Sequence, residues 1–333
     1  MPTSSLNPFP TGTDSTRKER TATMATSKYT DFTQKDLVYK TVNNHEISTT
    51  VLIPKNIQPG KHPLLVHFHG GFLICGSKLY EEWHAVWTIQ LAAQKGAILV
   101  TPNYRLLPEA NGREVLDDIA DFWSWIKSSL PREVENMAKG VEVDVNNVLV
   151  AGESAGGYLA VQSALLHPDA GIKAVISQYG MLDNRIPHFS QKGEKNMAGA
   201  PQQPESEIED YLRDMKKGAV RTETHPWELW LFICATVQAG RYLEFLGDGQ
   251  GVHAIDNLGK AKSMPACWII HGKEDSLVPI EASNNFVDKL KQVQHDTPLR
   301  YTIQPGEHGF DGAVTMDADW VKEGCAWLEK YWP

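Results

Sequence analysis

The chain has few cysteines, no long hydrophobic run and no excess of positive charge over its 333 residues. Its four cysteines are widely scattered without metal-ligand spacing; they are typical of buried small side chains, although the sequence leaves their pairing open. No apolar run is long enough to cross a bilayer, so no integral membrane association is expected. The formal net charge of -9 argues against a nucleic-acid or anionic-membrane partner.

The N-terminal stretch, residues 1–27, also has almost no large apolar side chains and is rich in Ser, Thr and Pro. This composition predicts disorder, and the stretch has no apolar core of the kind found in signal peptides. No Asn-x-Ser/Thr glycosylation site occurs anywhere in the sequence. Together with the scattered cysteines, these absences favour a reducing, cytoplasmic compartment.

Beyond residue 27, short β-branched runs alternate with amphipathic stretches, and 37–42 and 47–53 predict an antiparallel pair. Six later runs have the composition of strands buried on both faces. They are 64–69, 97–102, 148–151, 174–178, 267–271 and 299–303. Apolar positions at helical spacing mark residues 115–126, 286–293 and 320–331. This alternation predicts an α/β fold with a mostly parallel, twisted sheet and helices on both faces.

One interval, residues 183–263, contains no strand pattern. Ser206 and Glu209 have the spacing of a capping box, and residues 227–246 predict a second, strongly apolar helix. A helical insertion between two strands is a natural lid over a catalytic edge; helices packed elsewhere on the body are the alternative. The predicted division is a disordered segment at 1–27, a core at 28–182 and 264–333, and a cap at 183–263.

The segment Gly152-Glu153-Ser154-Ala155-Gly156 follows the apolar run at 147–151 and precedes a helical stretch. A strand that turns sharply into a helix forces its middle residue into a strained conformation and exposes the hydroxyl of Ser154. Glycines flank the serine because side chains there would collide across the turn. This pattern predicts the nucleophile of a serine hydrolase.

A serine hydroxyl needs a base, and the base needs an orienting acid. His308 follows the last predicted strand and Asp275 the preceding one, so both are expected at the edge where Ser154 lies. The order Ser, Asp, His is that of α/β-hydrolases. Singly each signal is weak, since a loop histidine is usually solvated and an aspartate often caps a turn. Glu274 is the competing acid, and the motif favours Asp275.

The sequence also predicts an oxyanion hole. Gly70 and Gly71 end a predicted strand, where glycine lets backbone N–H groups approach a substrate closely. Donors from this turn, with the N–H of Ala155, would bind the developing negative charge of a tetrahedral intermediate. An ordinary glycine turn is the alternative reading, which the neighbouring nucleophile motif disfavours.

These motifs together resemble the hormone-sensitive-lipase-like branch of the α/β-hydrolases. That branch has His-Gly-Gly-Gly followed by an aromatic residue, Gly-Asp/Glu-Ser-Ala-Gly-Gly, and Tyr-Arg-Leu-Ala-Pro-Glu, which is matched here at Tyr104–Glu109. The resemblance covers residues 35–332. One departure is Phe72 at the third glycine of the oxyanion turn, so Gly71 and Ala155 are safer donors than Phe72.

The resemblance implies a carboxylic-ester hydrolase with Ser154, Asp275 and His308 as catalytic triad, a helical cap, and neither metal nor cofactor. Trp227 and Trp230 in the predicted cap favour a small, fairly apolar ester as substrate. Two alternatives stay open. The same triad could transfer the acyl group or cyclise a bound intermediate in specialised metabolism. The fold could also serve as a ligand-binding receptor, as in the plant gibberellin receptors, although these lack the catalytic histidine. The oligomeric state is not predicted.

Overall fold

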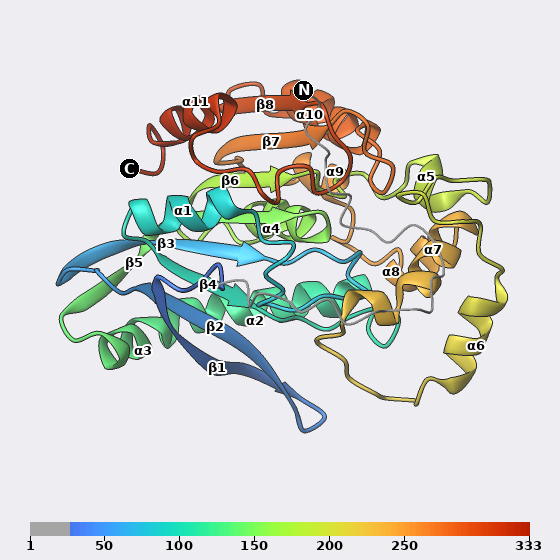
Figure 1. Ribbon diagram of the computed structural model, residues 1–333, viewed down its shortest axis with the longest axis horizontal. Helices are drawn as coiled ribbons and strands as arrows, with labels where there is room; N and C mark the ends of the chain where they lie inside the picture. The colour runs from blue at the N-terminus through green and yellow to red at the C-terminus, as the bar shows by residue number, and fades with distance from the viewer. Residues whose placement is uncertain (1–26) are drawn as a thin grey trace, which may run out of the picture.

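The computed structural model describes residues 27–333, so the prediction of disorder for residues 1–27 lies outside the described part except at Ser27. One sheet with the strand order β1-β2-β4-β3-β5-β6-β7-β8 runs through this part of the protein (Figure 1). The strands are β1 (Phe32–Val42), β2 (His45–Pro54), β3 (Gly60–Phe68), β4 (Ile98–Pro102), β5 (Val141–Glu153), β6 (Ile172–Gln178), β7 (Ala266–Gly272) and β8 (Leu299–Gln304). Every strand predicted from the sequence is present.

The sheet is mostly parallel, as predicted. Strand β2 pairs antiparallel with β1 and with β4, whereas all pairings from β4 to β8 are parallel. The central strands are buried on both faces, which explains their continuous apolar runs: all residues of β4 and β7 are buried. Because the strands are parallel, the loops that follow β3, β5, β7 and β8 meet at one edge.

Helices cover both faces of the sheet (Figure 1). The apolar side chains of α1 and α11 pack with one face, and those of α2, α4 and α10 pack with the other. The helices of the body are α1 (Val86–Gln94), α2 (Gly112–Ser128), α3 (Leu130–Met137), α4 (Ala155–Leu166), α10 (Glu281–Val293) and α11 (Asp319–Leu328). The predicted stripes at 115–126, 286–293 and 320–331 correspond to α2, α10 and α11.

Helix α2 is capped at its N-terminus by two reciprocal hydrogen bonds. Asn111 accepts a hydrogen bond from the Glu114 N–H at 3.1 Å, and the Glu114 carboxylate accepts one from the Asn111 N–H at 3.0 Å. This reciprocal capping box satisfies two backbone donors at the helix N-terminus. The helix therefore begins at a defined residue, which places Asp118 one turn further along toward the sheet.

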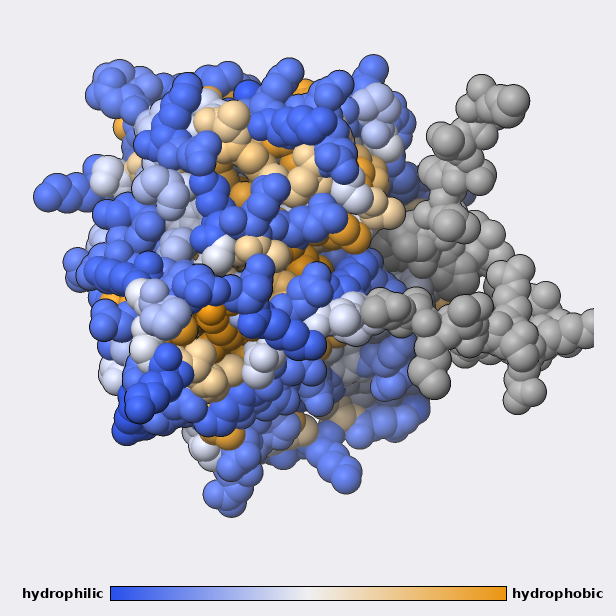
Figure 2. All heavy atoms as spheres, turned by 60° about the vertical axis from the view of Figure 1, so that its left-hand side comes forward, coloured by the Kyte–Doolittle hydropathy of each residue, from blue (hydrophilic) through white to orange (hydrophobic). Residues whose placement is uncertain are grey.

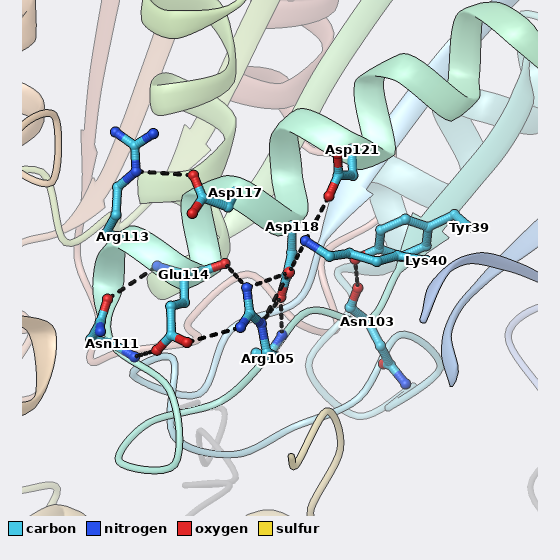
Figure 3. Close-up of polar contacts among 10 residues, drawn as sticks. All are labelled: Tyr39, Lys40, Asn103, Arg105, Asn111, Arg113, Glu114, Asp117, Asp118 and Asp121. Atoms are coloured by element: carbon cyan, nitrogen blue, oxygen red, sulfur yellow. Dashed lines mark hydrogen bonds and ion pairs between the residues drawn. The ribbon is translucent and has the colours of Figure 1, made fainter. Parts of the chain in front are cut away.

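Asp118 is a buried aspartate at the centre of an ion-pair network between α2, β1 and the loop after β4 (Figure 3). Its carboxylate accepts hydrogen bonds from the backbone N–H and the Nε of Arg105, both at 2.9 Å, and lies 2.8 Å from Lys40 Nζ. Lys40 also contacts Asp121 at 2.6 Å, and Arg105 contacts Glu114 at 3.0 Å. The arginine of the Tyr104–Glu109 motif thus ties this loop to the body.

The interval from 183 to 263 is helical in its named elements. It contains α5 (Pro187–Ser190), α6 (Ser206–Asp214), the 3-10 helix η1 (Pro226–Glu228), α7 (Trp230–Gln238), α8 (Tyr242–Leu246) and α9 (Ala254–Leu258). Figure 1 shows α5 to α8 together on the side of the molecule toward which the arrows of β3 and β6 point. Helix α9, in contrast, packs against α4 and α10 of the body.

Two local predictions in this interval were wrong. Ser206 does not cap α6, because the first turn already begins at Pro204 and Glu205, whose carbonyls accept the N–H of Glu207 and Ile208. The single apolar helix predicted over 227–246 is divided into η1, α7 and α8. Gly240, with φ of 71°, ends α7, and a Cβ there would lie 2.4 Å from the carbonyl carbon of Gln191.

The protein presents a largely hydrophilic surface on the face shown in Figure 2, with hydrophobic residues visible in separate patches. The large hydrophobic side chains exposed in the described residues, Val38, Leu231, Val293 and Ile303, belong to four different elements or their ends. No helix within residues 27–333 is long and apolar enough to span a membrane. The four cysteine thiols are all free.

Candidate active site

A cavity of about 960 Å³ opens at the edge where the loops after β3, β5 and β8 meet. Ser154 and His308 both line it, so two of the three predicted catalytic residues lie on the same cavity. Its walls are mainly apolar and aromatic. They include Phe72, Trp83, Val86, Trp230, Ile233, Leu277 and Phe310.

Ser154 stands between β5 and α4 in a strained conformation, with φ of 57° and ψ of -120°. Its N–H donates to the carbonyl of Gln178 at 2.8 Å, which ties the turn to the end of β6. A Cβ at Gly156 would lie 1.9 Å from the Phe68 carbonyl oxygen, and one at Gly152 would lie 2.4 Å from Gly156. The prediction that glycines are required on both sides of the serine is therefore confirmed.

The Ser154 hydroxyl is buried and forms no hydrogen bond with any described residue. It forms none with His308 in this arrangement, although both residues face the cavity. Catalytic hydrogen bonds are often long before substrate binds and shorten in the complex. The hydroxyl is thus held at the cavity wall without a protein partner that would compete with a substrate.

His308 and Asp275 form a direct pair. The ring nitrogen Nδ1 of His308 donates to Oδ2 of Asp275 at 2.7 Å, and both side chains are buried. The other carboxylate oxygen accepts the N–H groups of Leu277 and Val278 at 3.0 and 2.8 Å. In the neutral imidazole, a proton on Nδ1 leaves Nε2 free to accept one, which is the tautomer that a general base requires.

The pKa of the Asp275 carboxyl is lowered. Burial alone would raise this pKa, but the charge of His308 and hydrogen bonds from His271 and His308 outweigh the effect of burial. The carboxylate therefore stays ionised well into the acid range. An ionised partner on Nδ1 stabilises the cation that forms when Nε2 takes a proton.

Glu274, the competing acid in the sequence, has a different role. Its carboxylate accepts the N–H of Gly306 at 2.6 Å, and its own N–H donates to the Gly306 carbonyl at 3.1 Å. Glu307 similarly bridges the two loops by accepting the N–H groups of Ser276 and His308. These bonds lock the loop of Asp275 to the loop of His308 and leave Asp275 as the acid on the imidazole.

The turn after β3 supplies free backbone donors. Gly71, Phe72 and Leu73 have φ values of 109°, 58° and 60°, so three successive residues are left-handed. The N–H groups of Gly71 and Phe72, and that of Ala155 at the start of α4, form no hydrogen bond with another residue in the described part of the chain. The Phe72 side chain is buried and packs edge-on against Tyr242, and this packing offsets part of the cost of a left-handed residue other than glycine.

Gly70 differs from its neighbours in this turn. Its N–H already donates to Oε1 of Glu153 at 2.9 Å, and a Cβ there would lie 3.0 Å from the Glu153 carbonyl oxygen. The other oxygen of Glu153 contacts Nε2 of His67 at 2.6 Å. The structure therefore argues against the predicted donor at Gly70, and Glu153 holds the turn in place.

Two residues that the sequence analysis did not single out support the loop of His308. Tyr179 packs edge-on against the His308 ring with centroids 4.6 Å apart, and its hydroxyl donates to Asp311 at 3.0 Å. Asp311 also accepts from Trp87 at 2.9 Å and from Gln178 at 2.7 Å. Asp311 lies three positions after His308, a proximity that could have drawn attention to it; no pattern in the sequence points to Tyr179.

The described residues contain no group of three or more His, Cys, Asp or Glu side chains arranged to hold a metal ion.

Comparison with known proteins agrees with this geometry. A family model described as the alpha/beta hydrolase fold matches residues 65–311. The chain is 34% identical over 315 residues to a probable carboxylesterase, M8, of a Phoma species, covering 92% of this chain and 98% of that protein. It is also 34% identical over 188 residues to a probable carboxylesterase, clz11, of Cochliobolus lunatus, covering 55% of this chain and 86% of that protein.

Among solved structures, esterase B of Lactobacillus rhamnosis superposes with a TM-score of 0.62 at 17% identity, over 90% of this chain and 85% of that one. This similarity shows the fold. The chain belongs to the hormone-sensitive-lipase-like branch of the alpha/beta hydrolase fold family.

Proposed function

We propose that the protein hydrolyses carboxylic esters through an acyl-enzyme intermediate on Ser154. The observation that carries this proposal is a strained, unpartnered serine hydroxyl on the same cavity as an imidazole oriented by a buried carboxylate. Similarity to carboxylesterases over most of the chain supports the same reaction. The three side chains come from the loops after three different strands, β5, β7 and β8.

In the proposed reaction, Nε2 of His308 takes the proton of Ser154 while the serine oxygen attacks the acyl carbon. The tetrahedral oxyanion lies against the N–H groups of Gly71, Phe72 and Ala155, which have no partner among the described residues. Losing one such donor typically costs about 3–4 kcal/mol of transition-state stabilisation. His308 then protonates the leaving alcohol and afterwards activates the water that releases the acid.

The walls of the cavity favour a small, fairly apolar ester. Phe72, Trp83 and Phe310 line it from the body, and Trp230 and Ile233 line it from α7. A substrate that fills such a cavity gains affinity mainly from buried apolar area.

We propose that the interval 183–263 acts as a cap, with α5 to α8 as the part over the cavity. Arg221 anchors this interval to the body: it donates to the carbonyl of Ile74 at 2.6 Å and pairs with Glu109 at 2.6 Å. It also contacts the carbonyl of Leu107. The cap is thus tied to the Tyr104–Glu109 loop, and motion of α7 would change the cavity wall.

We also propose a cytoplasmic location and a small-molecule ester as the partner. Four free thiols, three of them buried, are consistent with a reducing compartment.

The proposal is tested by labelling the purified protein with a fluorophosphonate and locating the modified residue by mass spectrometry. We expect modification of Ser154 in the wild type and none in Ser154→Ala. In a second experiment, a chromogenic ester is turned over in ¹⁸O-labelled water and the products are analysed by mass spectrometry. Label in the released acid supports hydrolysis, whereas an unlabelled cyclic or transferred product would show that the acyl-enzyme is resolved by another acceptor.

A further inference from the structure

Lys28 lies on the wall of the cavity, 126 positions before Ser154 in the sequence, and it is the only lysine or arginine among the described lining residues. Its Nζ donates to the carbonyl of His84 at 2.7 Å. Within residues 27–333 it forms no ion pair with a carboxylate. A half-buried ammonium with three donors therefore has one neutral acceptor.

The backbone around Lys28 is pinned in place. The Lys28 N–H donates to the Glu81 carboxylate at 2.6 Å, and the Ser27 hydroxyl donates to the same group at 2.6 Å. The buried hydroxyl of Tyr29 lies 2.8 Å from Nδ1 of His84. The segment is thus attached to the loop before α1 on both sides of Lys28, which holds the Lys28 backbone at the cavity wall.

The acidic groups around this cavity are mostly occupied by other partners. Glu153 contacts His67 and Gly70, and Glu307 accepts two backbone N–H groups. Glu82 is exposed at the wall and is not hydrogen-bonded to Lys28. Burial lowers the pKa of the Lys28 ammonium, while the charges of Glu81, Glu82, Glu153 and Asp311 act in the opposite direction. These carboxylates favour the charged form of Lys28 without using its donors.

We propose that Lys28 binds a carboxylate of the substrate, so that the preferred ester carries one negative charge in addition to its scissile ester group. The inference rests on the proposed ester hydrolysis and names its substrate class. A single carboxylate matches a single ammonium. A phosphate would bring a second negative charge to a wall that already contains Glu82 and Glu153. The remaining apolar lining suits the hydrocarbon between the ester and the carboxylate.

The test compares ester pairs that differ only in this charge. On the acyl side the pair is the 4-nitrophenyl ester of hexanoic acid and the 4-nitrophenyl hemiester of adipic acid. On the alcohol side it is 4-methylphenyl acetate and 4-acetoxybenzoate. For each pair, the ratio of kcat/KM for the anionic ester to that for the neutral ester is measured in the wild type, Lys28→Met, Lys28→Arg and Lys173→Met.

We expect this ratio to fall about 10- to 100-fold in Lys28→Met for at least one pair, mainly through KM, because a hydrogen bond to a charged group is lost. Lys28→Arg should retain most of the preference. Lys173→Met removes the same charge at the exposed N-terminal end of β6, on the opposite edge of the sheet, and should leave the ratio at its wild-type value. Ratios in Lys28→Met within twofold of the wild type for both pairs would overturn the proposal. So would equal losses on anionic and neutral esters, which would mean that Lys28 only balances the nearby carboxylates.

Binding separates this proposal from the catalytic one. Calorimetric titration of Ser154→Ala with monomethyl adipate and with methyl hexanoate needs no turnover. We expect the added Lys28→Met change to weaken binding of the anionic ligand about 10-fold or more relative to the neutral one. Unchanged selectivity would reject the Lys28 site even in an active hydrolase. Retained selectivity in a protein that cleaves no ester would reject the hydrolase proposal alone.

Discussion

Asp118 and Asp311 are both completely buried aspartates, yet their surroundings differ. Asp118 is met by two cations, Arg105 and Lys40, and the arginine binds it through both backbone and side chain (Figure 3). Within residues 27–333, Asp311 receives hydrogen bonds only from neutral donors: an indole, an amide and a phenol. The cations at the first site compensate the buried charge of Asp118. The neutral donors at the second site leave a charge on Asp311 without a cation beside it.

The wider regions around these residues show the same contrast. In the Asp118 network, cations contact both oxygens of the aspartate. The network holds the Tyr104–Glu109 loop against the body. At the catalytic edge, the Ser154 hydroxyl has no described partner, its backbone is strained, and three N–H groups are unused. Unsatisfied groups cost stability, so their concentration at one cavity indicates that a ligand satisfies them. Predictions for the two regions therefore separate activity from stability.

The largest expected effect is on activity. Ser154→Ala should lower kcat for an accepted ester by about 10⁶-fold. Its free energy of unfolding should change by less than about 1 kcal/mol, because the lost hydroxyl makes no hydrogen bond within the described protein. Steady-state kinetics and urea denaturation measure the two quantities. Residual turnover near the wild-type rate would exclude Ser154 as the nucleophile.

Asp275→Asn should lower kcat by about 10⁴-fold, because an amide stabilises the wrong tautomer of His308 and cannot stabilise its cation. Asp311→Asn serves as a comparison, since Asp311 lies in the loop of His308 but is hydrogen-bonded to Trp87, Gln178 and Tyr179 instead of the imidazole. The pair is measured by kcat with a chromogenic ester. An equal loss in both variants would mean that Asp275 only supports the loop.

Substitutions in the ion-pair network of Asp118 should change the free energy of unfolding instead of the activity. Asp118→Ala leaves Arg105 and Lys40 partly uncompensated in a buried place, which typically costs about 3–5 kcal/mol. Its matched control is Asp117→Ala on the same helix, where an exposed pair with Arg113 at 2.9 Å contributes less than about 1 kcal/mol. Urea denaturation gives both values. If both variants lost a similar amount of unfolding free energy, the buried ion pairs of Asp118 would not differ in strength from the exposed pair of Asp117.

The smallest effect concerns pH. Burial raises the pKa of Asp311, the hydrogen bonds from Trp87, Gln178 and Tyr179 only partly oppose this, and Glu153 adds to it. Between the unfolded value of about 3.9 and the raised folded value, the unfolded chain has lost its proton while the folded protein retains it. Raising the pH through this window therefore favours unfolding.

Asp275 has the opposite sign in a different window. Its lowered folded pKa stabilises the protein above the unfolded value of about 3.9, and this contribution is lost as the pH falls toward the folded value.

Because the folded pKa of Asp311 is raised, the difference in unfolding free energy between wild type and Asp311→Asn should decline as the pH rises above about 4. Titrating both proteins with urea from pH 3 to 8 tests this; a difference independent of pH would show that Asp311 ionises normally.

Local patterns in the sequence were sufficient to predict the positions of most strands and helices and the turn at Ser154. Strand and helix positions follow from apolar periodicity, because a buried strand or an amphipathic helix needs the same spacing wherever it is placed. The Ser154 turn also follows from its neighbours, since the flanking glycines are required within a few residues of the serine. The order of Ser154, Asp275 and His308 after strand ends predicted the edge that they share.

Contacts between distant segments were decided only by the tertiary structure. The Gly70 N–H was predicted to face the substrate, but Glu153 occupies it from another strand. The helix over 227–246 was predicted to be continuous, but Gly240 ends α7 where the chain passes Gln191. Lys28 reaches the cavity through bonds to a loop more than fifty residues away. Periodicity and local motifs constrain which elements form, whereas hydrogen-bond partners depend on which surfaces those elements bring together.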